Sequence, residues 1–238
     1  MLRNLLGLVF SVAVLAARAE PMPAVAELFT SQGCSSCPPA DQLLGELATR
    51  TDVIALAYHV DYWDALGWRD RFSLEAATAR QRAYARSLAL ANVYTPQMVV
   101  DGTRDVVGSD RTEVLAALAG KRDGIVPVLA AGNGALTVEM PPQAGEMPPQ
   151  AGGFDATVTL VGFVRSAETK VARGENAGRL LREFAIVRAI YDLGGWNGAA
   201  RRFSFALSRL PPDCSDVAVL VQKGAQGRMI GAARLSLQ

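Results

Sequence analysis

The chain has 238 residues, half of them hydrophobic, with 24 basic and 23 acidic residues and a formal net charge of +1. This balance gives no reason to expect nucleic acid or an anionic membrane surface as a partner. The length allows one large domain or two small ones, each able to bury a core.

The first segment has the order of a secretory signal peptide. One basic residue, Arg3, precedes an apolar run from Leu5 to Ala17, and the run ends in Ala17-Arg18-Ala19. Small residues on both sides of one position are typical of a cleavage site, so we expect a signal peptide at 1–19. An uncleaved anchor is the alternative, but the run is shorter than the roughly 20 residues that span a bilayer. We therefore expect a periplasmic or secreted protein with no membrane span after cleavage.

Strand and helix patterns alternate after the signal peptide. Residues 24–29 predict a short strand, and Pro38 with Pro39, tolerated in a first helical turn, predicts a helix after the next loop. Residues 52–60 form a nearly unbroken apolar run, which is typical of a parallel strand buried on both faces. Residues 73–90 predict a helix, for which Ser73 is the expected N-cap.

A third strand is predicted at 94–102, and its end, Asp101-Gly102, is a hairpin signal. A short fourth strand follows, and then Asp110 with Glu113 resembles a capping box for a helix that ends near Gly120. The order β-α-β-α-β-β-α over residues 20–122 is that of a thioredoxin-like domain. The fold class we expect is α/β.

The sequence pattern of residues 123–238 differs from that of the first half. Short alternating runs separated by Gly, Pro and Asn predict a mainly antiparallel, sandwich-like β domain. Residues 179–196 fit either a helix or a strand, and their surroundings favour a strand. A tandem duplication at 140–153 (MPPQAGE, MPPQAGG) lengthens a loop, to which we assign no function.

The motif Cys34-Ser35-Ser36-Cys37 is the main candidate for chemistry. At a helix start, unpaired N–H groups and the helix dipole favour the thiolate of Cys34, which is the attacking species in disulfide exchange. Cys37, one turn on, would resolve the mixed disulfide, and the spacing lets the two sulfurs form a Cys34–Cys37 disulfide. Two alternatives stay open: a permanent crosslink in a non-catalytic binding module, and a Cu(I) site of Cys34, Cys37 and His59. A structural zinc site would need more ligands, and there is no second CxxC.

Other polar side chains are expected to converge on this motif. The strand that starts near Gln97 should run antiparallel to the first strand, which places Thr95-Pro96 beside Cys34. The exit of the second strand brings four candidate substrate-binding residues to the same edge: His59, Asp61, Tyr62 and Trp63. For His59, the only histidine, the alternatives are a lowered thiol pKa of Cys34, a metal ligand, or a loop hydrogen bond to Asp61 or Asp64.

The motifs resemble a known family. Segment 24–102 resembles the thioredoxin superfamily, and several stretches resemble the exported bacterial family DUF1223: ELFTSQGCSSCPPAD, HVDYWDALGWRD, RQRAYA, YTPQMVVDG, RGENAG and LGGWNG. The thioredoxin resemblance implies a cis Pro96 that contacts the disulfide, with Thr95 offering backbone contacts to substrate. It also places Glu27 near a buried acid that moves protons for the resolving cysteine, although the match needs one extra loop residue. An exposed or salt-bridged Glu27 is the alternative.

The sequence therefore favours an exported thiol–disulfide oxidoreductase that uses the CSSC pair and no cofactor. Its partners would be exported thiol or disulfide proteins, or small thiols. Cys214 makes the cysteine count odd, and its turn-like context predicts a partly buried spare thiol.

Overall fold

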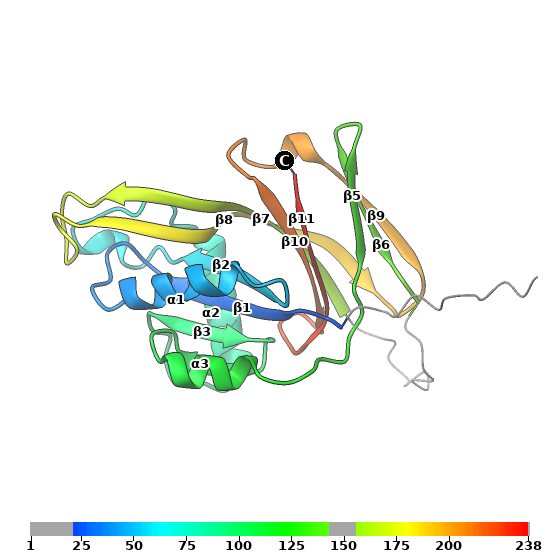
Figure 1. The fold of residues 1–238 in the computed structure, drawn as a ribbon, viewed down its shortest axis with the longest axis horizontal. Coiled ribbons are helices and arrows are strands. Elements are labelled where there is room, and N and C mark those ends of the chain that lie inside the picture. Colours follow the sequence, from blue (N-terminus) through cyan, green and yellow to red (C-terminus); the bar gives the residue numbers. More distant parts are fainter. Residues whose placement is uncertain (1–20, 143–155, 238) are drawn as a thin grey trace, which may run out of the picture.

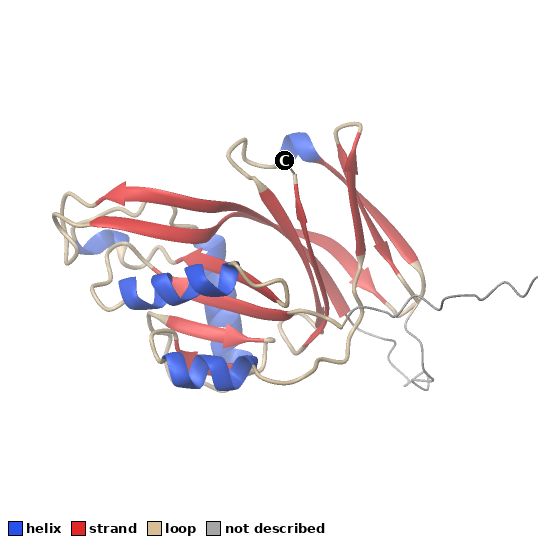
Figure 2. Ribbon diagram, viewed as in Figure 1, coloured by secondary structure: helices blue, strands red, loops and turns tan. Residues whose placement is uncertain are grey.

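The computed structural model of the protein describes residues 21–142 and 156–237 (Figure 1). The expected signal peptide at 1–19 and most of the duplicated stretch at 140–153 lie outside these residues. Within them the molecule is α/β, with one large mixed sheet, a smaller sheet and few helices (Figure 2).

The large sheet has eight strands in the order β11-β10-β7-β8-β2-β1-β3-β4. The first half of the chain supplies β1 (Ala24–Thr30), β2 (Val53–His59), β3 (Gln97–Val100), β4 (Arg104–Val107), α1 (Pro38–Ala48), the 3-10 turn η1 (Asp64–Leu66), α2 (Glu75–Ser87) and α3 (Arg111–Leu118). Strand β1 pairs parallel with β2 and antiparallel with β3, and β3 pairs antiparallel with β4. The elements expected from the pattern of residues 24–118 are present in the expected order.

The second half supplies mainly strands within the described residues. These are β5 (Val128–Gly132), β6 (Ala135–Met140), β7 (Ala156–Lys170), β8 (Leu180–Trp196), β9 (Arg201–Ala206), the 3-10 turn η2 (Leu207–Arg209), β10 (Asp216–Lys223) and β11 (Met229–Ser236). Strands β7, β8, β10 and β11 extend the large sheet, while β5, β6 and β9 form the small antiparallel sheet. Residues 179–196 are almost entirely strand, as their surroundings indicated.

The two halves share one sheet, because β2 pairs parallel with β8 at Ala57 and Ile186. The sheet therefore continues across the expected boundary at residue 122. Two hydrophobic cores result: one packs the helices of the first half against the large sheet, and the other fills the space between the two sheets. Burial of apolar side chains in these cores contributes about 1.5–3 kcal/mol for each large residue.

Local sequence signals explain where several elements begin and turn. Asp101 (φ 51°) and Gly102 (φ 70°) both have positive φ, as a tight turn between antiparallel strands requires. The side chain of Asp110 accepts the Glu113 N–H at 3.0 Å, which confirms the predicted cap of α3. The expected cap of α2 was wrong: Leu74 is the N-cap, because the Ser73 hydroxyl donates instead to Asp64 Oδ2 at 2.7 Å.

Strands β7 and β8 form a long hairpin that runs alongside α1 (Figure 1). Helix α1 approaches β8 closely at Gly45, where an added Cβ would lie 2.5 Å from Cδ2 of Phe184. The loop between the two strands, residues 171–179, reaches the turn that precedes α1, and we call it the cover segment. The second half of the chain therefore contributes directly to the surroundings of the CSSC motif.

Candidate functional site

The CSSC motif lies in the turn between β1 and α1, and its two cysteines form a disulfide. Their Cα atoms are 5.4 Å apart, and Cys37 is the residue immediately before α1. Pro38 and Pro39 occupy the first turn, where their missing N–H groups leave no helical hydrogen bond unmade. Both cysteines are fully buried, at 0% exposure, while Ser35 and Ser36 between them are exposed.

Thr95 and Pro96 reach the same edge of the sheet as the disulfide. The Thr95–Pro96 peptide bond is cis, as the thioredoxin resemblance implied. The indole N–H of Trp63 donates to Thr95 Oγ1 at 2.9 Å, and a Cβ on Gly33 would lie 3.4 Å from Cβ of Trp63. Trp63 therefore connects the residue before Pro96 with the residue before Cys34.

The cover segment explains why the disulfide is buried. Asn176 is fully buried, and its side-chain amide donates to the backbone carbonyls of Gln32 (3.0 Å) and Cys34 (2.9 Å). The backbone N–H of Ser35 donates to Glu175 Oε2 at 3.0 Å. The main-chain polar groups of the CSSC turn are thus bound by a segment about 140 residues away in the sequence.

A cluster of buried charged groups lies next to the CSSC turn. His59 Nδ1 is 2.7 Å from Asp70 Oδ2 and 3.8 Å from Glu183 Oε1. The side chain of Gln32 donates to Glu183 at 2.9 Å, and its backbone N–H donates to Asp70 at 2.8 Å. Because Gln32 is two residues before Cys34, these hydrogen bonds tie the cluster to the disulfide turn.

The charges in this cluster shift one another's pKa values. Burial alone would lower the pKa of His59, but the carboxylates of Asp70, Glu183 and Asp41 raise it to about 9. Burial would raise the pKa of Asp70, yet the His59 imidazolium and two backbone N–H groups keep it below its usual value. Burial raises the pKa of Glu183. At neutral pH the imidazole is therefore charged.

Asp41 is a further acidic side chain beside this cluster. It lies on α1 four residues after Cys37, and its N–H donates to the Cys37 carbonyl at 3.1 Å. Thr30 at the end of β1 donates to Asp41 Oδ1 at 2.8 Å. Burial raises the pKa of Asp41 to about 7, against the opposing effects of His59 and of the Thr30 hydroxyl. This carboxyl group can gain or lose a proton near neutral pH.

Glu27 lies away from the disulfide, contrary to the expected role. It is fully buried, and Oε1 accepts from Arg80 Nε on α2 at 2.6 Å, while the Tyr84 hydroxyl donates to Oε2. Successive side chains of a strand point to opposite faces. Thr30 faces α1, so Glu27, three residues earlier, faces α2. The extra loop residue before the CSSC motif thus moves this acid to the wrong face, and the salt-bridged alternative is the one observed.

The four expected substrate-binding residues have different surroundings. His59 is 1% exposed and cannot line an open groove, and its hydrogen bond goes to Asp70 rather than to Asp61 or Asp64. Asp61 accepts from the Thr78 hydroxyl at 2.5 Å, which ties it to α2. Tyr62 and Trp63 are partly buried against the core. Of the four, Trp63 is the one with contacts to both Gly33 and Thr95.

The copper alternative receives no support from the geometry. Among the described residues, the group whose ligand atoms come together consists of His59, Asp70 and Glu183, all within 4.8 Å, and it includes neither cysteine. Two hard carboxylates and an imidazole do not suit Cu(I), which prefers thiolates. His59 is hydrogen-bonded to Asp70, and Gln32 donates to both carboxylates, so these residues form a charge cluster.

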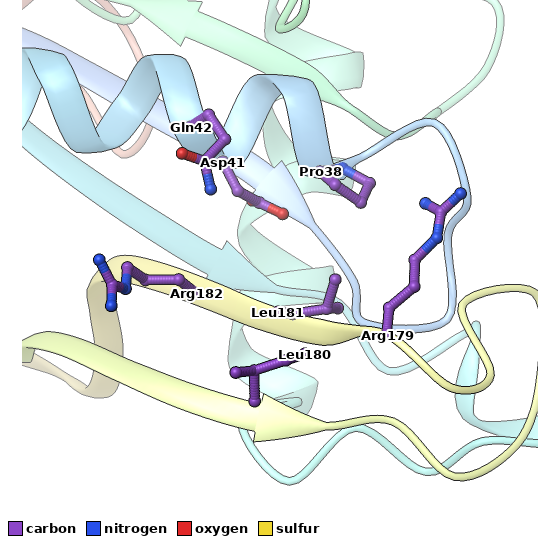
Figure 3. A pocket seen from close by; sticks show the side chains of 7 residues that line it. All are labelled: Pro38, Asp41, Gln42, Arg179, Leu180, Leu181 and Arg182. Carbon is purple, nitrogen blue, oxygen red and sulfur yellow. The ribbon is translucent and has the colours of Figure 1, made fainter.

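A pocket of about 320 Å³ opens beside the first turn of α1 (Figure 3). Pro38, Asp41 and Gln42 form one side, and the other is formed by Arg179, the last residue of the cover segment, and by Leu180, Leu181 and Arg182 at the start of β8. We call it the Arg179 pocket. Pro38 follows Cys37 in the chain and Arg179 ends the cover segment, so the pocket is near both, although neither cysteine lines it.

Sequence reasoning missed Asp41, Asp70, Glu183 and Asn176. Three of them lie within quoted motifs: Asp41 in PPAD, Asp70 in HVDYWDALGWRD and Asn176 in RGENAG. Cys214 is free and buried, and burial raises its thiol pKa to about 11, as expected for a spare thiol. Among the described residues, none of the helices has the length and hydrophobicity needed to cross a membrane.

Comparisons with known proteins identify relatives of the whole fold. Residues 25–222 match the model of the family described as "Protein of unknown function (DUF1223)". The chain is similar to a crystal structure of a protein from Agrobacterium tumefaciens, with 29% identity, a TM-score of 0.77, and coverage of 93% of this chain and 97% of that one. It is also similar in fold to HBP35 of Porphyromonas gingivalis, with 15% identity, a TM-score of 0.61, and coverage of 92% and 77%. No curated protein matches the chain.

Proposed function

This chain belongs to the DUF1223 family of proteins of unknown function, and we propose that it is an exported thiol–disulfide oxidoreductase that works through the Cys34–Cys37 pair. The observation that carries the proposal is the disulfide at the start of α1, with the cis Thr95–Pro96 bond at the start of the strand beside β1. The element order of residues 24–118 supports placing this half of the chain in the thioredoxin superfamily.

The proposed reaction exchanges one disulfide for another. A substrate thiolate attacks Sγ of Cys34, a sulfur–sulfur bond forms between them, and the Cys34–Cys37 bond breaks with its electron pair left on Cys37. A second substrate thiolate then displaces Cys34, which releases the substrate disulfide. Two thiols are oxidised and the protein disulfide is reduced, and the reverse sequence reoxidises it. Attack at Cys34 is favoured because the electron pair is then left on Cys37, the N-cap of α1, where the N-terminal end of the helix stabilises a thiolate.

Asp41 is the group we assign to the proton on Cys37. Its backbone is hydrogen-bonded to Cys37, and a pKa of about 7 matches what a general acid or base needs near neutral pH. Asp41 takes the role that the sequence assigned to Glu27, which is held by Arg80 on the other face of the sheet.

A second candidate function is a non-catalytic binding module in which Cys34–Cys37 is a permanent crosslink. The observation that favours it is the complete burial of both cysteines. An exchange catalyst must expose Cys34 during turnover, so our proposal requires the cover segment to move away from the CSSC turn. The two functions therefore differ in whether the bond can be opened under moderate conditions.

The proposal includes export. The signal peptide expected at 1–19 would direct the protein to the periplasm or to the outside of the cell, where a CxxC pair can cycle against an oxidising environment. Its partners would then be exported thiol or disulfide proteins, or small thiols, with no nucleic acid and no cofactor.

The test is the redox midpoint of the Cys34–Cys37 pair in the purified protein. Cys214→Ser removes the spare thiol, glutathione buffers set the potential, and alkylation followed by mass measurement counts the free thiols. We expect a midpoint between about −120 and about −270 mV, the range of known exchange catalysts. Cys34 should be alkylated before Cys37, and Cys34→Ser should abolish exchange.

A bond that stays closed well below about −300 mV would contradict the proposal and favour the crosslinked binding module. Asp41→Asn gives a second readout. It should slow the opening of the bond most at pH values below about 7, where the unaltered carboxyl group carries a proton for Cys37.

A further inference from the structure

We infer that the Arg179 pocket binds small thiols that carry a carboxylate, and that these thiols, rather than protein thiols, are the substrates of the Cys34–Cys37 pair. The inference rests on the proposed function and specifies the substrate class of the same site.

The cover segment leaves little room for a polypeptide substrate. A protein that binds beside a CxxC turn would do so through main-chain groups, but here the carbonyls of Gln32 and Cys34 are bound by Asn176. The Ser35 N–H is bound by Glu175. A small molecule needs none of these groups and displaces fewer contacts.

The Arg179 pocket is joined to the cover by a hydrogen bond. Arg179 Nη1 donates to Asn176 Oδ1 at 3.0 Å, and Asn176 in turn holds the Cys34 carbonyl at 2.9 Å. A carboxylate in the pocket would compete with Asn176 for the guanidinium group. Binding of the ligand would thereby weaken the contact by which Asn176 holds the cover segment over Cys34. Pro38, which follows Cys37 in the chain, lines this pocket.

The chemistry of the pocket suits an anionic ligand with a short aliphatic part. Two arginines, Arg179 and Arg182, and one acid, Asp41, line the pocket, and burial raises the pKa of Asp41 to about 7. Arg182 is paired with Glu168 at the surface, whereas the hydrogen bond of Arg179 goes to an uncharged amide. A guanidinium group can bind a carboxylate through two parallel hydrogen bonds. The apolar residues of the lining at β8 are Leu180, which is 64% exposed, and Leu181, which is buried.

The test uses three thiols of similar size and different charge: 3-mercaptopropionate (anionic), 2-mercaptoethanol (neutral) and cysteamine (cationic). The rate at which each opens the disulfide is measured in the Cys214→Ser protein at equal thiolate concentration. We expect the anionic thiol to react fastest. Arg179→Gln should lower the rate of the anionic thiol relative to that of the neutral thiol about tenfold, the equivalent of one charge-assisted hydrogen bond.

Arg202→Gln is the matched control, because Arg202 is also an exposed arginine, paired with Glu139 on the small sheet. It should change none of the three rates. Equal rates for the three thiols, or an equal loss for all of them in Arg179→Gln, would overturn the inference while the proposed function stands. A disulfide that neither these thiols nor dithiothreitol opens would instead overturn the proposed function.

A reduced, cysteine-containing polypeptide provides the last arm of the test. It should open the disulfide more slowly than 3-mercaptopropionate does, and Asn176→Ala, which loosens the cover, should speed its reaction. A polypeptide thiol that reacts as fast as the anionic small thiol in the unaltered protein would overturn the assigned substrate class.

Discussion

The two faces of strands β1 and β2 bury charged side chains in different ways. On the face covered by α2, the Glu27 carboxylate is matched by the Arg80 guanidinium, and the Tyr84 hydroxyl and Gln222 complete the hydrogen bonds. Arginine stays protonated in proteins, so Arg80 keeps its charge at any ordinary pH. We call it the Glu27–Arg80 cluster.

On the face covered by α1, one imidazole is surrounded by three carboxyl groups: Asp70, Glu183 and Asp41. The charges do not balance, and the pKa values of both His59 (about 9) and Asp41 (about 7) are raised above their ordinary values. His59 Nε2 has no hydrogen-bond partner among the described residues. We call this the His59–Asp41 cluster.

The difference teaches how to separate a structural buried charge from one that can take part in a reaction. The Glu27–Arg80 cluster is closed and satisfied, so its expected contribution is to stability. The His59–Asp41 cluster holds an acid that can exchange a proton near neutral pH, one helical turn from Cys37. The burial of their side chains alone would not have distinguished the two clusters.

The largest expected effect on stability comes from removing one charge of the Glu27–Arg80 cluster. Glu27→Gln leaves the Arg80 charge buried without its partner, and we expect a loss of about 3–5 kcal/mol in the free energy of unfolding. Urea unfolding measures it. Replacing both residues by Met removes both charges and should restore most of the stability.

The redox midpoint of the disulfide should not move in the double variant. A loss below about 1 kcal/mol for Glu27→Gln, which is the value of a surface pair, would contradict the assignment.

The second prediction concerns how the contribution of the His59–Asp41 cluster to stability depends on pH. The pKa of Asp41 is near 3.8 in the unfolded chain and about 7 in the folded protein, so the folded state holds this proton more tightly. Its contribution to stability is therefore complete below pH 3.8 and is lost as the pH rises through about 7. Asp41→Asn removes this dependence. The stability of the unaltered protein relative to the variant should fall by a few kcal/mol between about pH 4 and pH 8.

Urea unfolding of the two proteins across that range gives the comparison directly, because the other titrating groups are common to both. A constant difference in stability would show that Asp41 does not titrate in this way. The His59 contribution works in the same direction, since its pKa is raised from 6.5 to about 9 and its stabilisation is lost as the pH rises through that interval.

The smallest expected effect comes from a variant that changes the packing of α1 and leaves the face covered by α2 as it is. Gly45→Ala places a Cβ against the Phe184 ring, and overpacking of this kind costs about 1–3 kcal/mol. Because Glu183 precedes Phe184 in β8, the variant should also shift the pH dependence of the stability that the His59–Asp41 cluster contributes. The Glu27–Arg80 cluster should be unaffected. Gly132→Ala is the control, since an added Cβ there meets nothing within 4 Å.

The first half of the fold could be predicted from sequence because its signals are local. Apolar runs defined β1 and β2, the two prolines marked the start of α1, and Asp101-Gly102 marked the β3–β4 turn. The convergence of the CSSC turn with Thr95-Pro96 followed from strand direction alone. The face on which Glu27 lies could not be settled in the same way, because one additional loop residue before Cys34 reverses it.

The rest of the site could not be predicted, because it depends on contacts between distant segments. Glu183 and Asn176 reach the disulfide turn only because β8 pairs with β2, and that pairing crosses the expected domain boundary. Short alternating runs indicate a strand but not its neighbour in the sheet. Asp70 was within the quoted HVDYWDALGWRD stretch, yet nothing local distinguished it from Asp61 or Asp64 as the partner of His59.

The cover segment has a consequence for the order in which the protein matures. Asn176 follows Cys34 by 142 positions, so a ribosome completes the whole of the first half before it makes the residue that closes over the cysteines. During that interval an oxidant can reach the two thiols without the movement of the cover segment that the finished protein requires. The bond can thus be made early, in a nascent chain, and covered once the last third of the polypeptide arrives.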